Sequence, residues 1–221
     1  MMSLRSLKTW PRGRRVAVAG AAAALAVAVA GCGNVIQELT GPPTDLYTLT
    51  PKSTFSNGLP QVTWQLVVEE PIASGGLNVQ RIALRTHPTE LKYFAQANWT
   101  ERAPRMVQTL LVESFENSGA IVAVGRQAIG LRSDYNLKSE LREFQAEYLD
   151  GASTPTVRVR LNAKLIRQPQ RAIIGSRNFE AFQEASGTDM RSIVAAFDDA
   201  LGKVLRQTVE WTLKADRLAA G

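Results

Sequence analysis

Hydrophobic and polar residues alternate most strictly over residues 157–165. Apolar and polar side chains take turns there, in the order Val157, Arg158, Val159, Arg160, Leu161, Asn162, Ala163, Lys164 and Leu165. A period of two is typical of a strand with one buried and one solvated face. Weaker forms of the pattern predict strands at residues 46–49, 62–68, 79–86, 93–100, 121–124 and 172–182. The turn sequence His87-Pro88-Thr89-Glu90 joins two of these into a predicted hairpin.

Two segments show the spacing of three and four residues that is typical of helices. The first begins at Pro104 and ends before Asn117-Ser118-Gly119, where the glycine supplies a C-terminal cap. The second follows Thr188 and Asp189, either of which can cap its N-terminus. Its apolar face consists of Ile193, Phe197, Ala200, Leu201, Val204, Leu205, Thr208 and Trp211. The second segment therefore predicts a long amphipathic helix.

Residues 134–150 fit two interpretations. Helical spacing connects Leu137, Leu141, Phe144 and Tyr148. Strand alternation instead connects Leu137, Ser139 and Leu141, and a β-bulge would then shift the phase before Phe144. With the other elements, either interpretation predicts an α+β fold, in which a mostly antiparallel sheet carries two main helices on one face.

The first 31 residues have the pattern of a secretory signal peptide. They contain five Lys or Arg up to Arg15 and no acid, followed by an uncharged run of Val, Ala, Leu and Gly over residues 16–30. That run is shorter than the roughly 20 apolar residues that a membrane-spanning helix needs. Arg14-Arg15 leaves open whether export is by the Sec or the twin-arginine route. We expect a signal peptide (1–31), a lipidated tether (32–45), a folded domain (46–215) and a tail (216–221).

Cys32 is the candidate lipidation site. Val29-Ala30-Gly31-Cys32 looks like a bacterial lipobox, in which small residues let a peptidase cleave between Gly31 and Cys32. The freed cysteine carries diacylglycerol, and its acyl chains add about 0.8 kcal/mol per buried methylene, so they hold a protein on a membrane without a span. Gly33 stands where an aspartate would signal inner-membrane retention. We therefore expect a location on the periplasmic face of the outer membrane.

Charge and composition argue against nucleic-acid binding and against catalysis. The net charge is +6, but nearly all of it lies in the first 31 residues, so the mature chain lacks a basic surface for phosphates. His87 is the one imidazole, and no G-x-S-x-G nucleophile motif accompanies it. Neither Glu69-Glu70 nor Asp198-Asp199 is marked as a catalytic pair, and the second pair is most simply a solvated helix face. We expect no enzyme activity, no metal site and no cofactor.

The even positions of the most regular strand form a basic stripe. Arg158, Arg160 and Lys164 could contact an acidic partner or lipid head groups, or they could lie on a solvated face balanced by neighbouring acids. The second interpretation is the simpler one. Three of the four tryptophans lie in patterned elements, which predicts core or interface positions for Trp64, Trp99 and Trp211.

A series of short motifs resembles the ABC-type transport auxiliary lipoproteins, a family that includes the lipoprotein of the paraquat-inducible system. The similarity extends over roughly residues 45–213. The matching motifs, in order, are Asp45-Leu46-Tyr47-Thr48-Leu49-Thr50-Pro51, residues 82–85, Ala97-Asn98-Trp99-Thr100-Glu101 leading to Pro104 and Leu110-Leu111, Tyr135-Asn136-Leu137 with residues 140–144, and residues 193–201 leading to Trp211.

The resemblance implies a non-enzymatic subunit of an intermembrane lipid transporter. Such systems combine an ATPase, a permease and an MCE-domain protein, with the lipoprotein at the outer-membrane end. It also implies a domain similar to the N-terminal domain of TolB, and it is compatible with a ring-shaped homo-oligomer. Only the lipidated Cys32 carries over as a site. The main alternative function is an independent periplasmic shuttle that carries lipid in a cavity of its own.

Overall fold

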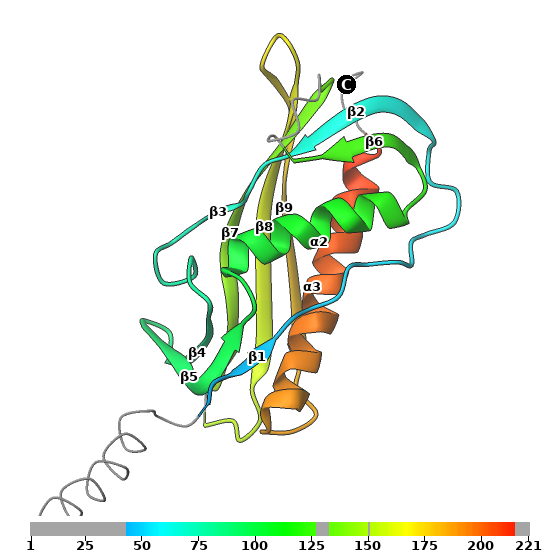
Figure 1. The fold of residues 1–221 in the computed structure, drawn as a ribbon. Coiled ribbons are helices and arrows are strands. Elements are labelled where there is room, and N and C mark those ends of the chain that lie inside the picture. The colour runs from blue at the N-terminus through cyan, green and yellow to red at the C-terminus, as the bar shows by residue number, and fades with distance from the viewer. Residues whose placement is uncertain (1–42, 127–132, 150, 215–221) are drawn as a thin grey trace, which may run out of the picture. The chain divides into compact units, whose positions relative to one another are not determined.

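The computed structural model describes residues 43–126, 133–149 and 151–214, and these form an α+β fold. A nine-stranded sheet lies behind two helices in Figure 1. The elements follow the order β1 (Asp45–Tyr47), β2 (Val62–Val68), β3 (Ile72–Ala73), β4 (Arg81–His87), β5 (Glu90–Trp99), α2 (Ala103–Asn117), β6 (Ile121–Gly125), β7 (Tyr135–Glu147), β8 (Thr156–Arg167), β9 (Ala172–Glu184) and α3 (Met190–Thr212). The predicted fold class is confirmed.

The long strand β7 organises the sheet. Along one side it pairs with β8, and β8 with β9, in two long antiparallel ladders. Along its other side β2, β3 and β4 lie in succession, each parallel to β7. The predicted antiparallel character therefore holds for the long ladders, while the short strands make the sheet mixed. β2, β3 and β4 are parallel to β7 because the chain follows the same edge of β7 in one direction from β2 through β3 to β4.

The ambiguous segment is the strand β7, and it contains the bulge that the strand interpretation required. Leu141 pairs with Leu161 of β8, but Glu143 already pairs with Arg160, so Arg142 is an extra residue. After the bulge, Phe144 faces the helices and Glu143 faces away from them. The helical spacing in this segment thus arises because the alternation of the strand shifts by one residue at the bulge.

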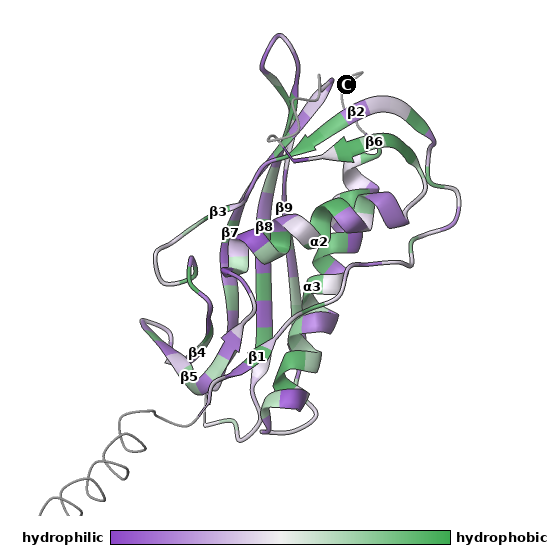
Figure 2. Ribbon diagram, in the orientation of Figure 1, coloured by the Kyte–Doolittle hydropathy of each residue, from purple (hydrophilic) through white to green (hydrophobic). Residues whose placement is uncertain are grey.

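Both predicted helices are present, with the predicted caps. Pro104 lies in the first turn of α2, and Gly119 follows its end with a φ of +61°. At the start of α3 the Asp189 carboxylate accepts hydrogen bonds from the backbone N–H groups of Arg191 and Ser192. Colouring by hydropathy shows the alternation along β8 and the apolar stripes of both helices (Figure 2).

The core lies between the sheet and the helices, and an aromatic cluster stands at its centre. The rings of Trp99, Phe144 and Phe197 come from β5, β7 and α3, with centroids 5.1 to 5.6 Å apart. Each of the three side chains is at most 1% exposed. Trp64 and Trp211 are also buried, as expected. Sequence positions almost a hundred residues apart therefore meet in one layer.

Residues 48–61 connect β1 to β2 and cross both helices; we call this segment the strap. Near its start, Thr50 donates from its backbone N–H and its hydroxyl to the carboxylate of Asp198, at 2.6 and 2.8 Å. Further along, the N–H of Ser56 donates to Glu210 at 2.9 Å. Asp198 is therefore not simply a solvated residue of α3, as the sequence suggested, because it fastens the strap to the helix.

Candidate functional site

The sheet face that is turned away from α2 and α3 carries the predicted basic stripe, and we call it the outer face. Side chains on a strand alternate between the two faces, so burying Val157, Val159 and Leu161 under the helices places Arg158 and Arg160 on the outer face. The corresponding outer residues of β7 are polar or charged, and so are most of those of β9, where Phe182, the register partner of Arg158, is the exposed aromatic exception. The outer face is the surface on which other molecules can contact the sheet.

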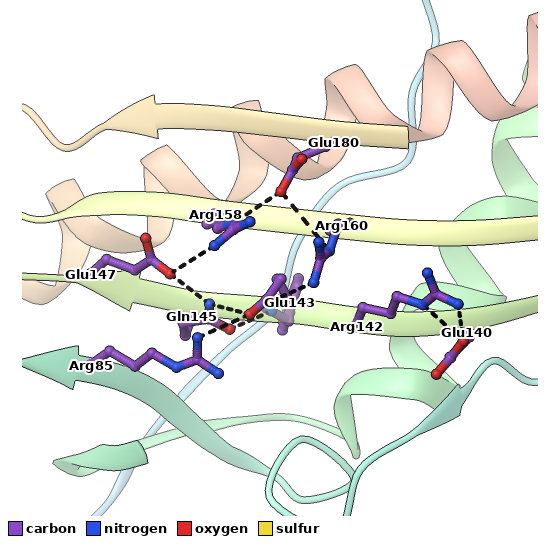
Figure 3. A network of polar contacts seen from close by, with 10 residues as sticks. Arg85, Glu140, Arg142, Glu143, Gln145, Glu147, Arg158, Arg160 and Glu180 are labelled. Carbon is purple, nitrogen blue, oxygen red and sulfur yellow. Dashed lines mark hydrogen bonds and ion pairs between the residues drawn. The ribbon is translucent and has the colours of Figure 1, made fainter. Parts of the chain in front are cut away.

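Glu143 lies at the centre of an ion-pair network on this face (Figure 3). Its Oε1 accepts a hydrogen bond from Arg160 at 2.6 Å, and its Oε2 lies 3.3 Å from Nη1 of Arg85. The side-chain amide of Gln145 donates to the same carboxylate at 2.8 Å. Because these partners come from β8, β4 and β7, one carboxylate joins three strands.

Gln145 extends the network to a second and a third carboxylate. Its fully buried amide also donates to Glu147 at 2.9 Å, and Arg158 connects Glu147, at 3.8 Å, to Glu180, at 2.8 Å. Burial works against the charged form of Arg158, but hydrogen bonding to Glu180 and the charges of Glu143 and Glu147 outweigh it and raise the pKa of Arg158. The network is electrically balanced, and within it Nε of Arg160 is buried without a hydrogen-bond partner, 4.0 Å from Glu180.

The balanced-face interpretation is confirmed for Arg158 and Arg160, since both are paired with glutamates. Sequence reasoning did not identify the acids in advance. Glu143, Gln145 and Glu147 alternate in the sequence, and that pattern is the signal that could have placed them on one face. It was obscured because the bulge at Arg142 separates them from the first half of the strand.

Further along the outer face is a hollow of about 290 Å³, which we call the lysine hollow. It is lined by Ile72, Lys138, Ser139, Glu140, Asn162 and Lys164. Lys138 and Lys164 stand directly opposite each other on β7 and β8. Ile72, from the short strand β3, is 74% exposed. The third residue of the predicted basic stripe thus has a different setting from the other two.

The carboxylates at the lysine hollow already form salt bridges. Arg142 binds Glu140 through Nε and Nη2 at 2.8 and 2.7 Å. Lys138 Nζ lies 3.4 Å from Glu69, which also accepts from Asn136. Lys138 and Glu69 also line a second, larger hollow of about 650 Å³ that includes Arg171.

The other candidate catalytic residues have structural settings. His87 ends β4 in the hairpin turn, where its Nδ1 lies 3.0 Å from the hydroxyl of Thr89. Glu69 and Glu70 face different partners, and Glu70 pairs with Arg102 at 3.2 Å. Among the described residues there is no group of three His, Cys, Asp or Glu side chains that could hold a metal ion.

Gly31 and Cys32 are outside the described residues, so the lipobox remains a prediction from sequence. Within residues 43–126, 133–149 and 151–214, no helix is both long and apolar enough to cross a membrane.

Comparison with known proteins identifies relatives across most of the folded chain. The family model of the ABC-type transport auxiliary lipoprotein component matches residues 47–209. An uncharacterised protein of Bradyrhizobium diazoefficiens is 29% identical over 150 residues, which are 68% of this chain and 40% of that protein. The match thus spans about two-fifths of the length of this relative.

Two solved structures are similar to the fold. The crystal structure of protein XCC0632 from Xanthomonas campestris has 36% sequence identity and a TM-score of 0.75, covering 80% of this chain and 99% of that one. A second crystal structure, of an uncharacterised protein, has 15% identity and a TM-score of 0.53, covering 81% of this chain and 98% of the other. The first supports the whole arrangement of elements, and the second supports the fold alone.

Proposed function

The chain belongs to the family of ABC-type transport auxiliary lipoprotein components, and from this membership we propose that it is a lipid-anchored periplasmic subunit. Its role is to dock a transporter, composed of an ABC transporter and an MCE-domain protein, to the outer membrane. The match over residues 47–209 carries the proposal, because it includes nearly all of the folded domain. We propose further that the role is one of binding and geometry, without catalysis, and that the transported molecule is a lipid.

Three observations support an anchored docking subunit. Val29-Ala30-Gly31-Cys32 provides a place for acyl chains, and Gly33 lacks the charge that favours inner-membrane retention. The outer face of the sheet carries mostly polar and charged side chains, together with the exposed apolar side chains of Ile72 and Phe182. Its arginines are already paired, so a partner could cover them without leaving single charges buried.

The anchor is tested by Cys32→Ala. We expect this variant to keep its signal peptide, because the peptidase cleaves only before a lipidated cysteine. It should also leave the outer-membrane fraction of a sucrose gradient. The measurement is immunoblotting of fractions after a high-salt wash, together with the mass of the purified protein. Persistent sedimentation of a Cys32→Ala protein with the outer membrane would contradict anchoring through this residue.

The docking role is tested by gentle detergent extraction of the full chain with a C-terminal tag, followed by mass spectrometry of bound proteins and lipids. Recovery of an MCE-domain protein with its permease and ATPase is the expected result. Recovery of the lipoprotein alone, with stoichiometric phospholipid, would favour the independent shuttle. Recovery of neither would contradict both functions. Native mass spectrometry of the same sample gives the number of copies in any homo-oligomer.

A further inference from the structure

We propose that the lysine hollow is the docking site for a segment of the transporter partner that carries a carboxylate beside an apolar side chain. The inference rests on the proposed function, since it names the surface through which the lipoprotein would hold its transporter. It is carried by the charges, the exposed isoleucine and the shape of one place on the outer face.

The hollow contains an unfavourable pair of like charges. Lys138 and Lys164 are direct cross-strand partners, and like charges in that position destabilise a sheet. Lys138 forms an ion pair with Glu69 at 3.4 Å. Within the described part of the chain, no carboxylate comes into ion-pair distance of Lys164, and the nearby Glu140 is held by Arg142. The site therefore keeps a positive charge that a carboxylate from outside would neutralise.

The arginine network around Glu143 differs in this respect. Arg85, Arg158 and Arg160 each have a glutamate within 3.3 Å. An anionic ligand there would have to break an existing ion pair, which opposes binding. At the lysine hollow the same ligand breaks none, so charge complementarity favours this place over its neighbours.

Ile72 adds an apolar contact to the same site. Its side chain is 74% exposed, and its register partner on β7 is Glu140, so it borders the two lysines. A ligand that covers Ile72 also covers the aliphatic stems of the lysines, whose ammonium groups can stay at the rim. Apolar contact and charge are then satisfied together by neighbouring residues of one peptide.

The shape favours a protein segment over a membrane surface. The lysine hollow is concave and, at about 290 Å³, has room for a few side chains. It also borders the edge of β3, a strand of only two residues. A flat lipid surface would meet the exposed rim of the sheet before it reached the floor of the hollow, whereas a loop or strand can enter it.

The test compares three single variants of the full lipidated protein, purified in detergent, for binding to the purified MCE-domain protein of the transporter. Lys164→Glu reverses the charge, and Ile72→Ser removes the apolar contact. Lys92→Glu is the matched control, since Lys92 is a strand lysine, 51% exposed, outside both hollows. We expect Lys164→Glu to weaken the affinity about tenfold or more. Ile72→Ser should weaken it several-fold, and Lys92→Glu should bind like the wild type.

A stability measurement separates docking from folding. Lys164→Glu replaces two like charges with an opposite pair across β7 and β8, so its unfolding temperature should stay the same or rise while binding falls. Weaker binding that is accompanied by a lower unfolding temperature would point to damage of the domain and would contradict the proposal.

The remaining outcomes are distinct. If the wild type binds the MCE-domain protein and both hollow variants bind equally well, the docking site is overturned and the proposed function stands. If the wild type does not bind at all, the proposed function fails, and the inference with it. Vesicles of phosphatidylcholine with phosphatidylglycerol provide the last arm. Loss of vesicle binding by Lys164→Glu, with partner binding unchanged, would replace the protein segment by a lipid surface.

Discussion

Gly119 is a residue whose backbone, and not its surroundings, dictates its identity. It follows the end of α2 with a φ of +61°, and a Cβ built on it meets nothing within 4 Å. An L-amino acid in this left-handed region has a backbone cost of about 1 kcal/mol. Replacement by any other residue is therefore opposed by strain alone.

The variant Gly119→Ala is expected to lower the free energy of unfolding by about 1 kcal/mol. Gly75→Ala is the matched control, because a Cβ on Gly75 also meets nothing within 4 Å and its φ is not positive. Urea unfolding followed by circular dichroism measures both. Equal stability of the two variants would show that the turn relaxes to a negative φ.

At the scale of elements, the bulge in β7 determines which side chains reach the outer face. Without the extra residue Arg142, the second half of the strand would turn Phe144 outward and Glu143 inward. Phe144 packs against Trp99 and Phe197, and Glu143 joins three strands, so both halves of the strand depend on the bulge. One extra residue therefore connects the aromatic core to the polar network.

Removing the charge of Glu143 is expected to weaken this connection. Glu143 is 10% exposed in its side chain, and Glu143→Gln leaves Arg85 without its carboxylate and Arg160 with only Glu180, 4.0 Å away. Both arginines reach solvent, so we expect the free energy of unfolding to fall by about 1–2 kcal/mol, less than for the loss of a fully buried pair. Glu140→Gln is the control, since that pair is half exposed, and less than about 0.5 kcal/mol is expected. Similar losses in chemical denaturation of both variants would contradict the central role of Glu143.

Several elements were predictable from sequence because their signals are local. The alternation of β8 and the amphipathic pattern of α3 extend over many residues and need no partner to be recognised. β3 was missed, since two residues are too few for a pattern. The parallel pairings along β7 were missed because they depend on where loops return the chain, which no local period records.

The candidate site shows the same division. Arg158, Arg160 and Lys164 were identified from one strand, but their different settings depend on residues of β3, β4, β7 and β9. The role of Asp198 was missed because its partner, Thr50, lies 148 residues away in the sequence. Side chains that act within one strand or helix were predictable, and side chains that join distant segments were not.

At the scale of the whole molecule, the strap makes stability depend on pH. Burial alone would raise the pKa of Glu210, but hydrogen bonds from Ser56 and Arg206 outweigh it and lower the pKa below its ordinary value of 4.5. A carboxylate with a lowered pKa stabilises the folded state above the pKa of the unfolded chain, and this contribution is lost as the pH falls through the folded pKa.

We therefore expect wild type and Glu210→Gln to differ most in unfolding free energy above pH 5. Their difference should shrink as the pH falls below about 4.5, where the unfolded and then the folded carboxyl bind protons. Urea unfolding at a series of pH values measures the two curves. Parallel curves from pH 7 to pH 3 would show that the contact between Glu210 and the strap contributes nothing to the acid dependence.

The parallel pairing of β1 with β5 has a mechanical consequence. Asp45, Leu46 and Tyr47 lie beside Ala97, Asn98 and Trp99, and the N–H of Thr100 donates to the carbonyl of Tyr47 at 2.9 Å. A pulling force directed along β1 from its N-terminal side loads the hydrogen bonds between β1 and β5 in shear. These bonds therefore share the load instead of opening one after another. Behind them, Thr50 bound to Asp198 and Lys52 bound to Ser114 pass the remaining force to α3 and α2. A domain that is pulled through this strand would bear tension with its core intact.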